Sequence, residues 1–311
     1  MRLLAHATQD EKMIKSYRDG KDLYATIASI AFKLPYEDCL EFYLDENGKK
    51  TSETNKQGKE RRAKAKAITL GVCYGKGIAA IAEDLKIPKE HAQEVYDSVM
   101  IAFPKLKQYM EDSQLMAKKL GYVTTLWGRK RRLPDMQLEP YEFDFSNFVV
   151  DTFDPLAFDN TTNIEAREEA ENKAIIYYTN QLNKAYGRAA KEQVKAKARE
   201  DGIIIKDNGA FIAQATRQCV NSRIQGSAGD LIKLAMLMIA DDEKLRQMGC
   251  KIILQVHDEL ISTCPIKYAE ECSNRLCELM NLAGGDLNVP FKSDAEITRA
   301  WYGEPLELEV G

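Results

Sequence analysis

Apolar side chains recur every three or four positions through roughly the first two-thirds of the chain, as along the buried face of a helix. Pro88 suits the first turn of such a helix, whereas Pro104 and Gly121 suit helix ends. The polar stretch 44–60, which contains an Asn-Gly turn signal, is expected to be an exposed loop. The predicted helices of this part span residues 10–33, 59–74, 85–104 and 103–121.

Patterns typical of strands appear at two places. Residues 122–135 carry β-favouring side chains around Gly128 and predict a hairpin, and residues 251–263 predict a strand, a turn and a second strand. The last third therefore predicts α+β structure after a helical beginning. The other expected elements are an irregular acidic stretch over 138–163, a long helix over 165–200, a short hairpin over 201–212, one or two helices over 213–247, a helix over 266–283 and a strand over 290–297.

Three polar residues interrupt the apolar run "IILQVHDELIS" at 252–262: His257, Asp258 and Glu259. Burying an unpaired carboxylate costs several kcal/mol, on the order of the stability of a whole domain. Either a cation meets these side chains, or the chain turns sharply there and exposes them to water.

Composition narrows the class of protein. With 311 residues, 44% of them hydrophobic and 30% charged, the chain is long enough for two globular domains. It has no run of about 18 apolar residues and no secretory signal pattern, so we expect no membrane span. Its seven cysteines form no CxxC pair, which argues against a zinc site or a disulfide framework. We expect a cytoplasmic protein with reduced thiols.

Charge is unevenly distributed along the chain, although the net charge is only −4. A single basic run is most often a solvated helix face. Several such runs in a chain that is acidic overall favour a shared surface for a polyanion. The basic runs are 58–66, 128–132 and 187–199, and the acidic ones are 41–46, 139–144 and 165–171.

One stripe of the helix predicted over 59–74 has the chemistry of a nucleotide site. Arg62, Lys66, Leu70 and Tyr74 follow one another at intervals of four, and each interval turns a helix only about 40° past a full rotation. The stripe runs from cationic to apolar and aromatic, which suits phosphates at one end and a base at the other. The alternative is a surface helix whose long cationic side chains cover apolar neighbours.

Four stretches together resemble family A (Pol I-like) DNA polymerases. The pattern RxxxKxxxLxxxYG at 62–75 resembles the fingers helix of that family, and QVHDEL at 255–260 resembles its second palm catalytic motif. Residues 121–135 resemble the segment between fingers and palm, and 217–236 resemble a palm helix. The resemblance covers 1–135 and 211–311. It implies an α+β fold, with helical fingers and a partial palm built on an antiparallel sheet.

The chain departs from the family pattern in several ways. It begins "MRLLAHATQDEK", so we expect that it starts inside the first palm motif and that the aspartate of that motif is absent. Leu70 stands where Phe or Tyr is usual, and Tyr24 stands where a histidine that contacts phosphate is common. The long stretch between the motifs is typical of divergent phage-like members. The expected division is 1–12 for the end of the first palm motif region, 13–136 for the fingers, 137–210 for an inserted helical extension and 211–311 for the palm.

The resemblance implies nucleotidyl transfer assisted by two Mg²⁺ ions. Asp258 would bind metal, Glu259 would be a nearby carboxylate, and His257 would approach the primer terminus. Arg62 and Lys66 would hold the dNTP triphosphate, and Lys66 would also be placed to give a proton to pyrophosphate.

Further contacts with substrate follow from the same resemblance. Leu70 would pack on the nascent base pair, and Tyr74 would lie beside the templating base. Contacts with the DNA primer-template are implied for Arg217, Asn221, Gln225, Arg129 and Arg131. For the two arginines of the hairpin, a plain solvated surface is an equal alternative.

Three hypotheses follow. In the first, the chain is the C-terminal part of a family A DNA polymerase, inactive alone and completed by an N-terminal polypeptide that supplies the thumb and the first palm aspartate. In the second, it is a catalytically dead polymerase remnant that binds nucleic acid. The third, an unrelated metal-dependent hydrolase built on the His-Asp-Glu triplet, lacks further clustered ligands in the sequence.

Overall fold

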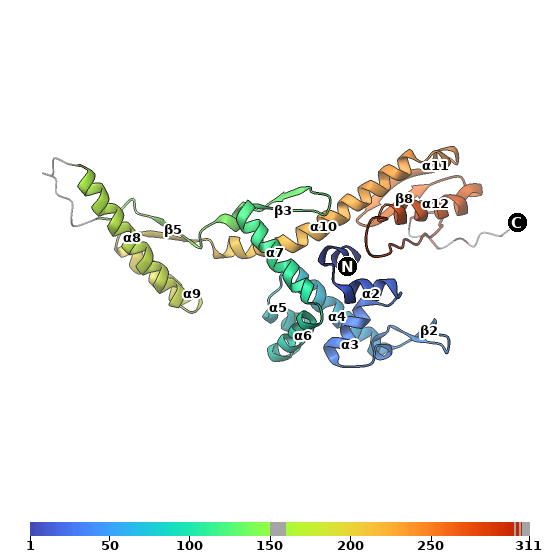
Figure 1. The fold of residues 1–311 in the computed structure, drawn as a ribbon, viewed down its shortest axis with the longest axis horizontal. Helices are drawn as coiled ribbons and strands as arrows, with labels where there is room; N and C mark the ends of the chain where they lie inside the picture. Colours follow the sequence, from blue (N-terminus) through green and yellow to red (C-terminus); the bar gives the residue numbers. More distant parts are fainter. Residues whose placement is uncertain (150–159, 302, 305, 307–311) are drawn as a thin grey trace. The chain divides into compact units, whose positions relative to one another are not determined.

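The computed structural model describes residues 1–149, 160–301, 303–304 and 306. The chain divides into two compact units: unit 1 is Met1–Leu133 with Thr216–Gly311, and unit 2 is Pro134–Ala215. The expected insertion at 137–210 falls within the range of unit 2, while the assignment of fingers and palm to particular ranges stays a prediction. Among the described residues every sheet is a two-stranded antiparallel pair, and helices dominate, so the predicted α+β class is confirmed (Figure 1).

Helices make up most of the N-terminal part of unit 1. The prediction of one helix over 10–33 is wrong, because Asp10 and Asp22 each cap a separate helix with their side chains. Gly20, at φ 66°, turns the chain between them. The helices over 59–74, 85–104 and 103–121 are confirmed, and α5 was not predicted. The bounds are α1 (Arg2–Thr8), α2 (Glu11–Arg18), α3 (Leu23–Phe32), α4 (Lys56–Cys73), α5 (Ile78–Leu85), α6 (Lys89–Ala102) and α7 (Pro104–Leu120).

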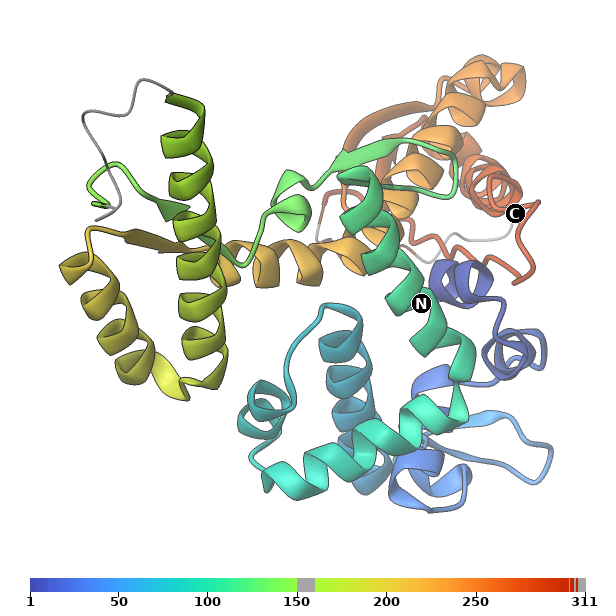
Figure 2. The ribbon, with the colours of Figure 1, turned by 60° about the vertical axis from the view of Figure 1, so that its left-hand side comes forward.

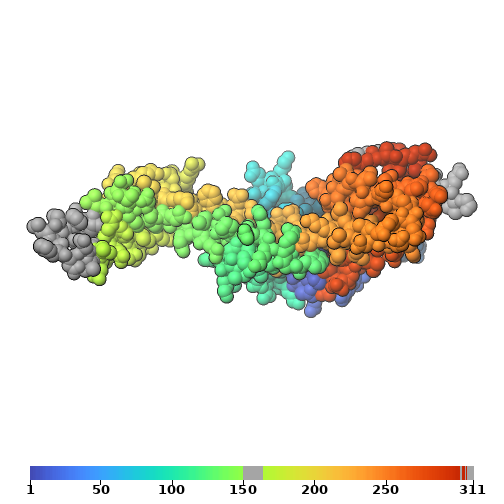
Figure 3. Space-filling model, turned by 90° about the horizontal axis from the view of Figure 1, so that it is seen from above, coloured from blue at the N-terminus to red at the C-terminus, as the bar shows by residue number. Residues whose placement is uncertain are grey.

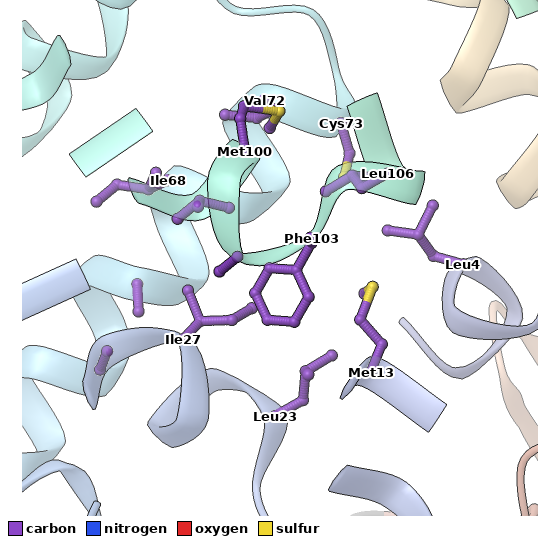
Figure 4. Packing of buried hydrophobic residues seen from close by; sticks show 14 of the residues in the cluster. Leu4, Met13, Leu23, Ile27, Ile68, Val72, Cys73, Met100, Phe103 and Leu106 are labelled. Carbon is purple, nitrogen blue, oxygen red and sulfur yellow. The ribbon is translucent and has the colours of Figure 1, made fainter. Parts of the chain in front are cut away.

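Phe103 lies at the centre of the core that joins these helices. It is 1% exposed and occupies the junction between α6 and α7, where Pro104 begins the second helix. Figure 4 shows its ring between Ile27 and Met13, with Leu23 below. This core fixes α4 against α3, and α4 is the helix that carries the predicted nucleotide stripe.

Two hairpins accompany these helices. The expected loop at 44–60 is only partly a loop, because β1 (Phe42–Leu44) pairs with β2 (Lys50–Thr54), and α4 begins soon after. Lys, Thr and Ser in β2 gave too little apolar alternation to be recognised as a strand. The hairpin expected at 122–135 is confirmed as β3 (Tyr122–Thr124) and β4 (Lys130–Arg132).

The C-terminal part of unit 1 is built around α10 (Gly209–Asp241), whose residues from Thr216 onward belong to this unit. Helices α11 (Glu243–Gln247) and α12 (Ala269–Leu282) follow, with the hairpin of β7 (Lys251–Val256) and β8 (Glu259–Thr263) between them. The strands at 251–263 and the helix over 266–283 are confirmed, the latter after the short turn η3 (Ile266–Tyr268). The strand expected at 290–297 is wrong. The surface of α10 and α11 in this unit is shown in orange in Figure 3.

Unit 2 is a helix pair beside a small sheet. Helices α8 (Asn160–Lys184) and α9 (Gly187–Glu200) pack side by side over the pair β5 (Tyr141–Asp144) and β6 (Ile204–Asp207), with η2 (Pro134–Gln137) before them (Figure 2). Its hydrophobic cluster is formed by the buried residues Tyr178, Leu182, Ala198, Ile203 and Ile205.

Three expectations for unit 2 are wrong. The stretch 138–163 contains a strand, β5, although residues 150–159 of it lie outside the described residues. The helix expected over 165–200 is interrupted around Tyr186. Residues 201–212 form no hairpin, because β6 pairs with the distant β5 and a helix starts at Gly209. In the part of the chain that the structure describes, no helix is long and apolar enough to cross a membrane.

Candidate functional site

Helix α4 presents the predicted stripe on its open side. Asn55 caps the helix by accepting a hydrogen bond from the Gly58 amide at 2.9 Å. The opposite face is buried through Ala65, Ile68 and Val72. Along the open side, Lys66 is exposed, Leu70 is half-buried and Tyr74, at the helix end, is 39% exposed, while Arg62 is partly covered. The structure therefore brings the four predicted residues onto one side of one helix.

An ion pair that the sequence reasoning missed holds Arg62. Its Nε donates to Oδ2 of Asp22 at 2.7 Å, and Nη1 lies 3.8 Å from Oε2 of Glu41. The other carboxylate oxygen of Asp22 accepts the amides of Tyr24 and Ala25 at the start of α3. One carboxylate thus caps a helix and restrains the guanidinium. The capping pattern was visible in the sequence, but the pairing with a residue 40 positions later was not.

Tyr24 lies between the two cations of the stripe. Its ring centroid is 5.6 Å from Cζ of Arg62 and 5.9 Å from Nζ of Lys66, which places both cations over the aromatic ring. Burial raises the pKa of the Tyr24 phenol to about 12, so the group stays neutral at physiological pH. No ion pair restrains Lys66 among the described residues, and its ammonium group is the freer of the two charges for an anionic ligand.

Helix α10 meets the end of the stripe at a small cavity of about 60 Å³. Leu70 and Tyr74 line it from one side, and Asn221 and Gln225 line it from α10. The Oδ1 atom of Asn221 is buried without a hydrogen-bond partner among the described residues. A buried amide oxygen without a partner costs about 1–3 kcal/mol, so this atom is suited to receive a donor from a ligand or from water.

Gly75 brings the two helices together. It adopts φ 68°, and a Cβ atom at this position would lie 2.7 Å from Cγ and 2.9 Å from Cα of Arg217. Only glycine allows both this conformation and this approach. Arg217 is therefore placed directly beside the end of the stripe, next to Tyr74. Five of the predicted contact residues converge here.

The hairpin of β7 and β8 shows how His257, Asp258 and Glu259 can interrupt an apolar run. His257 and Asp258 form its two-residue turn, with His257 at φ 54°, and positive φ at the first turn residue is a feature of type II′ hairpins. Both turn residues and Glu259 are exposed, so their charges lie in water. On one face of the hairpin, Ile252 and Leu260 pack against the cluster around α12.

The donor atoms at this turn fit a hard cation only in part. Carboxylate oxygens suit Mg²⁺, which binds one or two carboxylates and completes its shell with waters and phosphate oxygens. Asp258 and Glu259 supply such oxygens, and neither carboxylate makes a hydrogen bond or ion pair within the described part of the chain. Across those same residues, no three His, Cys, Asp or Glu side chains are grouped so as to hold a metal ion. The described residues therefore provide no cluster of metal ligands that would support the hypothesis of a metal-dependent hydrolase.

Of the two predicted arginines in the β3–β4 hairpin, one is already engaged. Arg129 donates from Nε to Asp230 at 2.6 Å and from Nη2 to the carbonyl of Gly226 at 2.9 Å, which fastens the hairpin to α10. Its side chain remains 55% exposed. Arg131 is exposed on β4, opposite Val123. A phosphate that bound Arg129 would have to compete with Asp230, whereas Arg131 is exposed to a phosphate from solvent.

Arg223 is a functional-site neighbour that the sequence reasoning missed. Its Nη1 donates to Oγ of the fully buried Ser113 at 2.7 Å, and its Nε donates to the carbonyl of Thr124 at 3.2 Å. The guanidinium also lies 4.3 Å from the ring centroid of Tyr109. Arg223 thus fixes α10 against α7 and β3, two residues from Asn221. Nothing in the local sequence distinguishes it from Arg217.

Comparison with known proteins gives matches over most of this chain. The family model of DNA polymerase family A matches residues 1–145 and 162–303. DNA polymerase I of Geobacillus stearothermophilus is 27% identical over 302 residues, which is 97% of this chain and 24% of that protein. The thermostable DNA polymerase I of Thermus aquaticus is 27% identical over 301 residues, 97% of this chain and 26% of that protein. The chain therefore spans about a quarter of the length of these relatives.

A solved structure shares the fold. It is the POL domain of Pol1 from M. smegmatis in complex with DNA primer-template and dNTP, with a TM-score of 0.61 and 24% sequence identity. The similarity covers 93% of this chain and 36% of that one.

Proposed function

The chain belongs to DNA polymerase family A, and from this premise we propose that it takes part in template-directed DNA synthesis, the transfer of a nucleotide from a dNTP to a primer 3′-OH. The observation that carries the proposal is the convergence of the α4 stripe and α10 on one cavity. A cationic end for phosphates and an apolar end for a base lie on the same helix face, and groups for a DNA strand lie beside them.

The nucleotide would lie along α4 with its triphosphate at the cationic end. Lys66, whose ammonium has no ion-pair partner in the described residues, would donate to phosphate oxygens and give a proton to the pyrophosphate that leaves. Arg62 reaches the same anion if the triphosphate competes with Asp22 for its guanidinium. Leu70 and Tyr74 would border the base, and the unpaired oxygen of Asn221 would accept a hydrogen bond from substrate or water.

Contacts with the DNA primer-template would come from several elements. Asn221 and Gln225 border the cavity, and donors and acceptors of this kind read features shared by all base pairs in the minor groove. Further proposed contacts are Arg217 beside Gly75, the exposed Arg131 and Arg129 of the β3–β4 hairpin, and His257 at the β7–β8 turn, which would face the primer terminus.

Asp258 would hold a divalent cation, for which Mg²⁺ is the proposed ion, with Glu259 as a nearby carboxylate. When bound, such ions stabilise the negative charge on the attacking and leaving oxygens of a phosphoryl transfer. The chain's own contribution is to hold the Asp258 carboxylate in water at the tip of the β7–β8 turn, without a competing partner in the described residues.

A second polypeptide is part of the proposal. Within the described residues no third His, Cys, Asp or Glu side chain joins Asp258 and Glu259, and a further carboxylate brought to the turn by another chain would complete a two-metal site. An N-terminal polymerase polypeptide is the proposed source. On this view the chain by itself binds DNA and dNTP but turns over little, because loss of one bridging ligand removes several kcal/mol of transition-state stabilisation.

Primer extension with Mg²⁺ and dNTPs tests the proposal. The chain is assayed alone and together with a second polypeptide, which contains the parts of DNA polymerase I that this chain does not cover. Wild type is compared with Asp258→Asn, and with Glu90→Gln as a control that removes an exposed carboxylate from α6. We expect extension only in the combination, its loss with Asp258→Asn, and no change with Glu90→Gln.

Binding of primer-template by the same variants separates the alternatives. If the two polypeptides bind each other and DNA, yet no combination extends a primer, the chain is a non-catalytic nucleic-acid-binding member of its family. If Asp258→Asn extends as well as wild type, the assignment of Asp258 is wrong.

A further inference from the structure

Charge in unit 2 is strongly separated along the sequence. Residues 172–199 contain seven Lys or Arg and a single acidic residue, Glu192, whereas residues 139–171 contain ten acidic residues and a single basic one, Arg167. The basic stretch comprises the second half of α8, the connection and nearly all of α9. A unit that is acidic overall therefore carries one cationic end, at its helix pair.

The connection between α8 and α9 projects an aromatic ring into solvent. Tyr186 is 99% exposed, and Gly187 next to it adopts φ 85° with no atom near the position of a Cβ. Lys184 and Arg188 flank the tyrosine and are exposed, and neither has an ion-pair partner in the part of the chain that the structure describes. The tip is thus an unsupported aromatic residue between two unpaired cations.

A second aromatic and cation pair lies on the same helix pair. Tyr177 is 45% exposed, and Nζ of Lys197 lies 5.7 Å from its ring centroid. Behind it the buried Tyr178 packs edge to face at 5.0 Å, which fixes the orientation of the outer ring. Lys184 lies seven residues after Tyr177, nearly two full turns, and so projects from the same side of α8.

Other cations of α9 are already engaged within the unit. Lys191 donates to the Tyr141 hydroxyl at 3.0 Å, and Lys195 lies 3.1 Å from Glu192 and 3.6 Å from Asp207. Their charges support the small sheet. The groups of the tip and of the second pair are exposed, and within the second pair Lys197 also donates to the Tyr177 hydroxyl at 3.4 Å. These groups are here called the α8–α9 patch: Tyr177, Lys184, Tyr186, Arg188 and Lys197.

We propose that the α8–α9 patch binds single-stranded DNA, with its tyrosines stacking on unpaired bases and its cations meeting the phosphates. Interleaved aromatic and cationic side chains are the combination by which proteins bind single strands without sequence preference. A duplex hides the faces of its bases, so projecting rings favour a single strand. The inference rests on the proposed function for the identity of the polyanion, and adds to it a separate site for one strand.

Fluorescence anisotropy of a labelled dT20 oligonucleotide with the full chain tests this. Stacking of one base contributes about 1–3 kcal/mol, which corresponds to a 5- to 150-fold change in affinity. We expect Tyr186→Ala to weaken binding about tenfold and Tyr186→Phe to preserve it. Tyr43→Ala is the control, because Tyr43 also carries an exposed ring, at 47%, but lies on β1 in unit 1, outside the patch.

Salt dependence tests the cations. Each phosphate neutralised on a single strand contributes about 0.7 to the slope of log affinity against log salt. The double variant Lys184→Gln with Arg188→Gln should therefore lower the slope by about 1.4. The proposal is overturned if these variants bind dT20 as wild type does, if duplex of the same length binds equally well through Tyr186, or if vesicles with phosphatidylserine bind the patch and dT20 does not.

Failure here and failure of the proposed function are separable. Primer extension by the combined polypeptides depends on Asp258, while dT20 binding by the patch depends on Tyr186. Loss of the first with retention of the second would leave the patch as a DNA-binding site in a chain that does not synthesise DNA.

Discussion

Gly75→Ala tests whether the site depends on the close approach of α4 and α10. The glycine has φ 68°, a conformation that costs a non-glycine residue roughly 1–2 kcal/mol. The added Cβ would also meet Arg217 at 2.7 Å from Cγ, 2.9 Å from Cα and 3.1 Å from Cβ. Because a backbone carbon is involved, a side-chain rotation cannot relieve the overlap, and overpacking of this kind costs about 1–3 kcal/mol.

The two contributions add to a loss of about 2–5 kcal/mol in the free energy of unfolding of unit 1. Gly48→Ala is the matched control, since Gly48 has φ 74° but no atom within 4 Å of the Cβ position. It keeps the conformational contribution and lacks the steric one, so we expect about 1–2 kcal/mol. The difference between the two variants isolates the contact between Gly75 and Arg217.

Urea unfolding followed by tryptophan fluorescence is the assay. Both tryptophans, Trp127 and Trp301, belong to unit 1, so the signal reports that unit. Affinity for dNTP should fall with Gly75→Ala, because Tyr74 precedes the displaced residue, and remain at the wild-type value with Gly48→Ala. If the two variants lose equal stability, α4 and α10 do not meet at Arg217 and the arrangement of the site is wrong.

Three further predictions concern the groups around the site. The variant Asp22→Asn keeps a good helix cap but releases Arg62, so we expect it to bind dNTP a few-fold more tightly than wild type, as measured by isothermal titration calorimetry. Weaker binding would mean that Asp22 orients the guanidinium productively. In the urea assay, Arg223→Met should lower the free energy of unfolding of unit 1 by about 2–3 kcal/mol, because the hydrogen bonds to Ser113 and to a backbone carbonyl are lost. The control Arg131→Met should change this free energy by less than about 0.5 kcal/mol. Burial raises the pKa of the Cys73 thiol from 9.0 to about 12. The contribution of the neutral thiol to folding stability is therefore fully present below about pH 9 and is lost as the pH rises toward 12. Thermal melting at a series of pH values should show a smaller decline for Cys73→Ala than for wild type.

Elements with a strong local signal were predictable from the sequence. The β7–β8 hairpin has apolar strands around a polar turn, and α4 and α7 have apolar faces with recognisable ends. Pairings between distant residues were not. β5 and β6 pair Tyr141 with Asp207 across the whole helix pair. β5 alternates apolar and polar residues over only four positions and β6 does not alternate, so neither pattern reveals its partner.

The same contrast holds for the candidate site. Helical spacing alone placed Arg62, Lys66, Leu70 and Tyr74 on one side of α4, because their relation is local. The restraint of Arg62 by Asp22 and the anchoring of α10 by Arg223 depend on packing between helices. A sequence pattern therefore identifies the groups that face a ligand better than the groups that hold them in place.

The exposure of Asp258 at the β7–β8 turn bears on how tightly the chain can bind Mg²⁺. A carboxylate in water attracts a cation weakly, because two charges 4 Å apart gain only about 1 kcal/mol at the dielectric constant of water. Affinity for Mg²⁺ must then come from several oxygens brought together, including the phosphates of a nucleotide held along α4. The chain alone should bind Mg²⁺ poorly and bind it better with dNTP present. That gain should depend on Lys66 as well as on Asp258, since in the proposed function Lys66 holds the phosphates that complete the coordination shell of the ion.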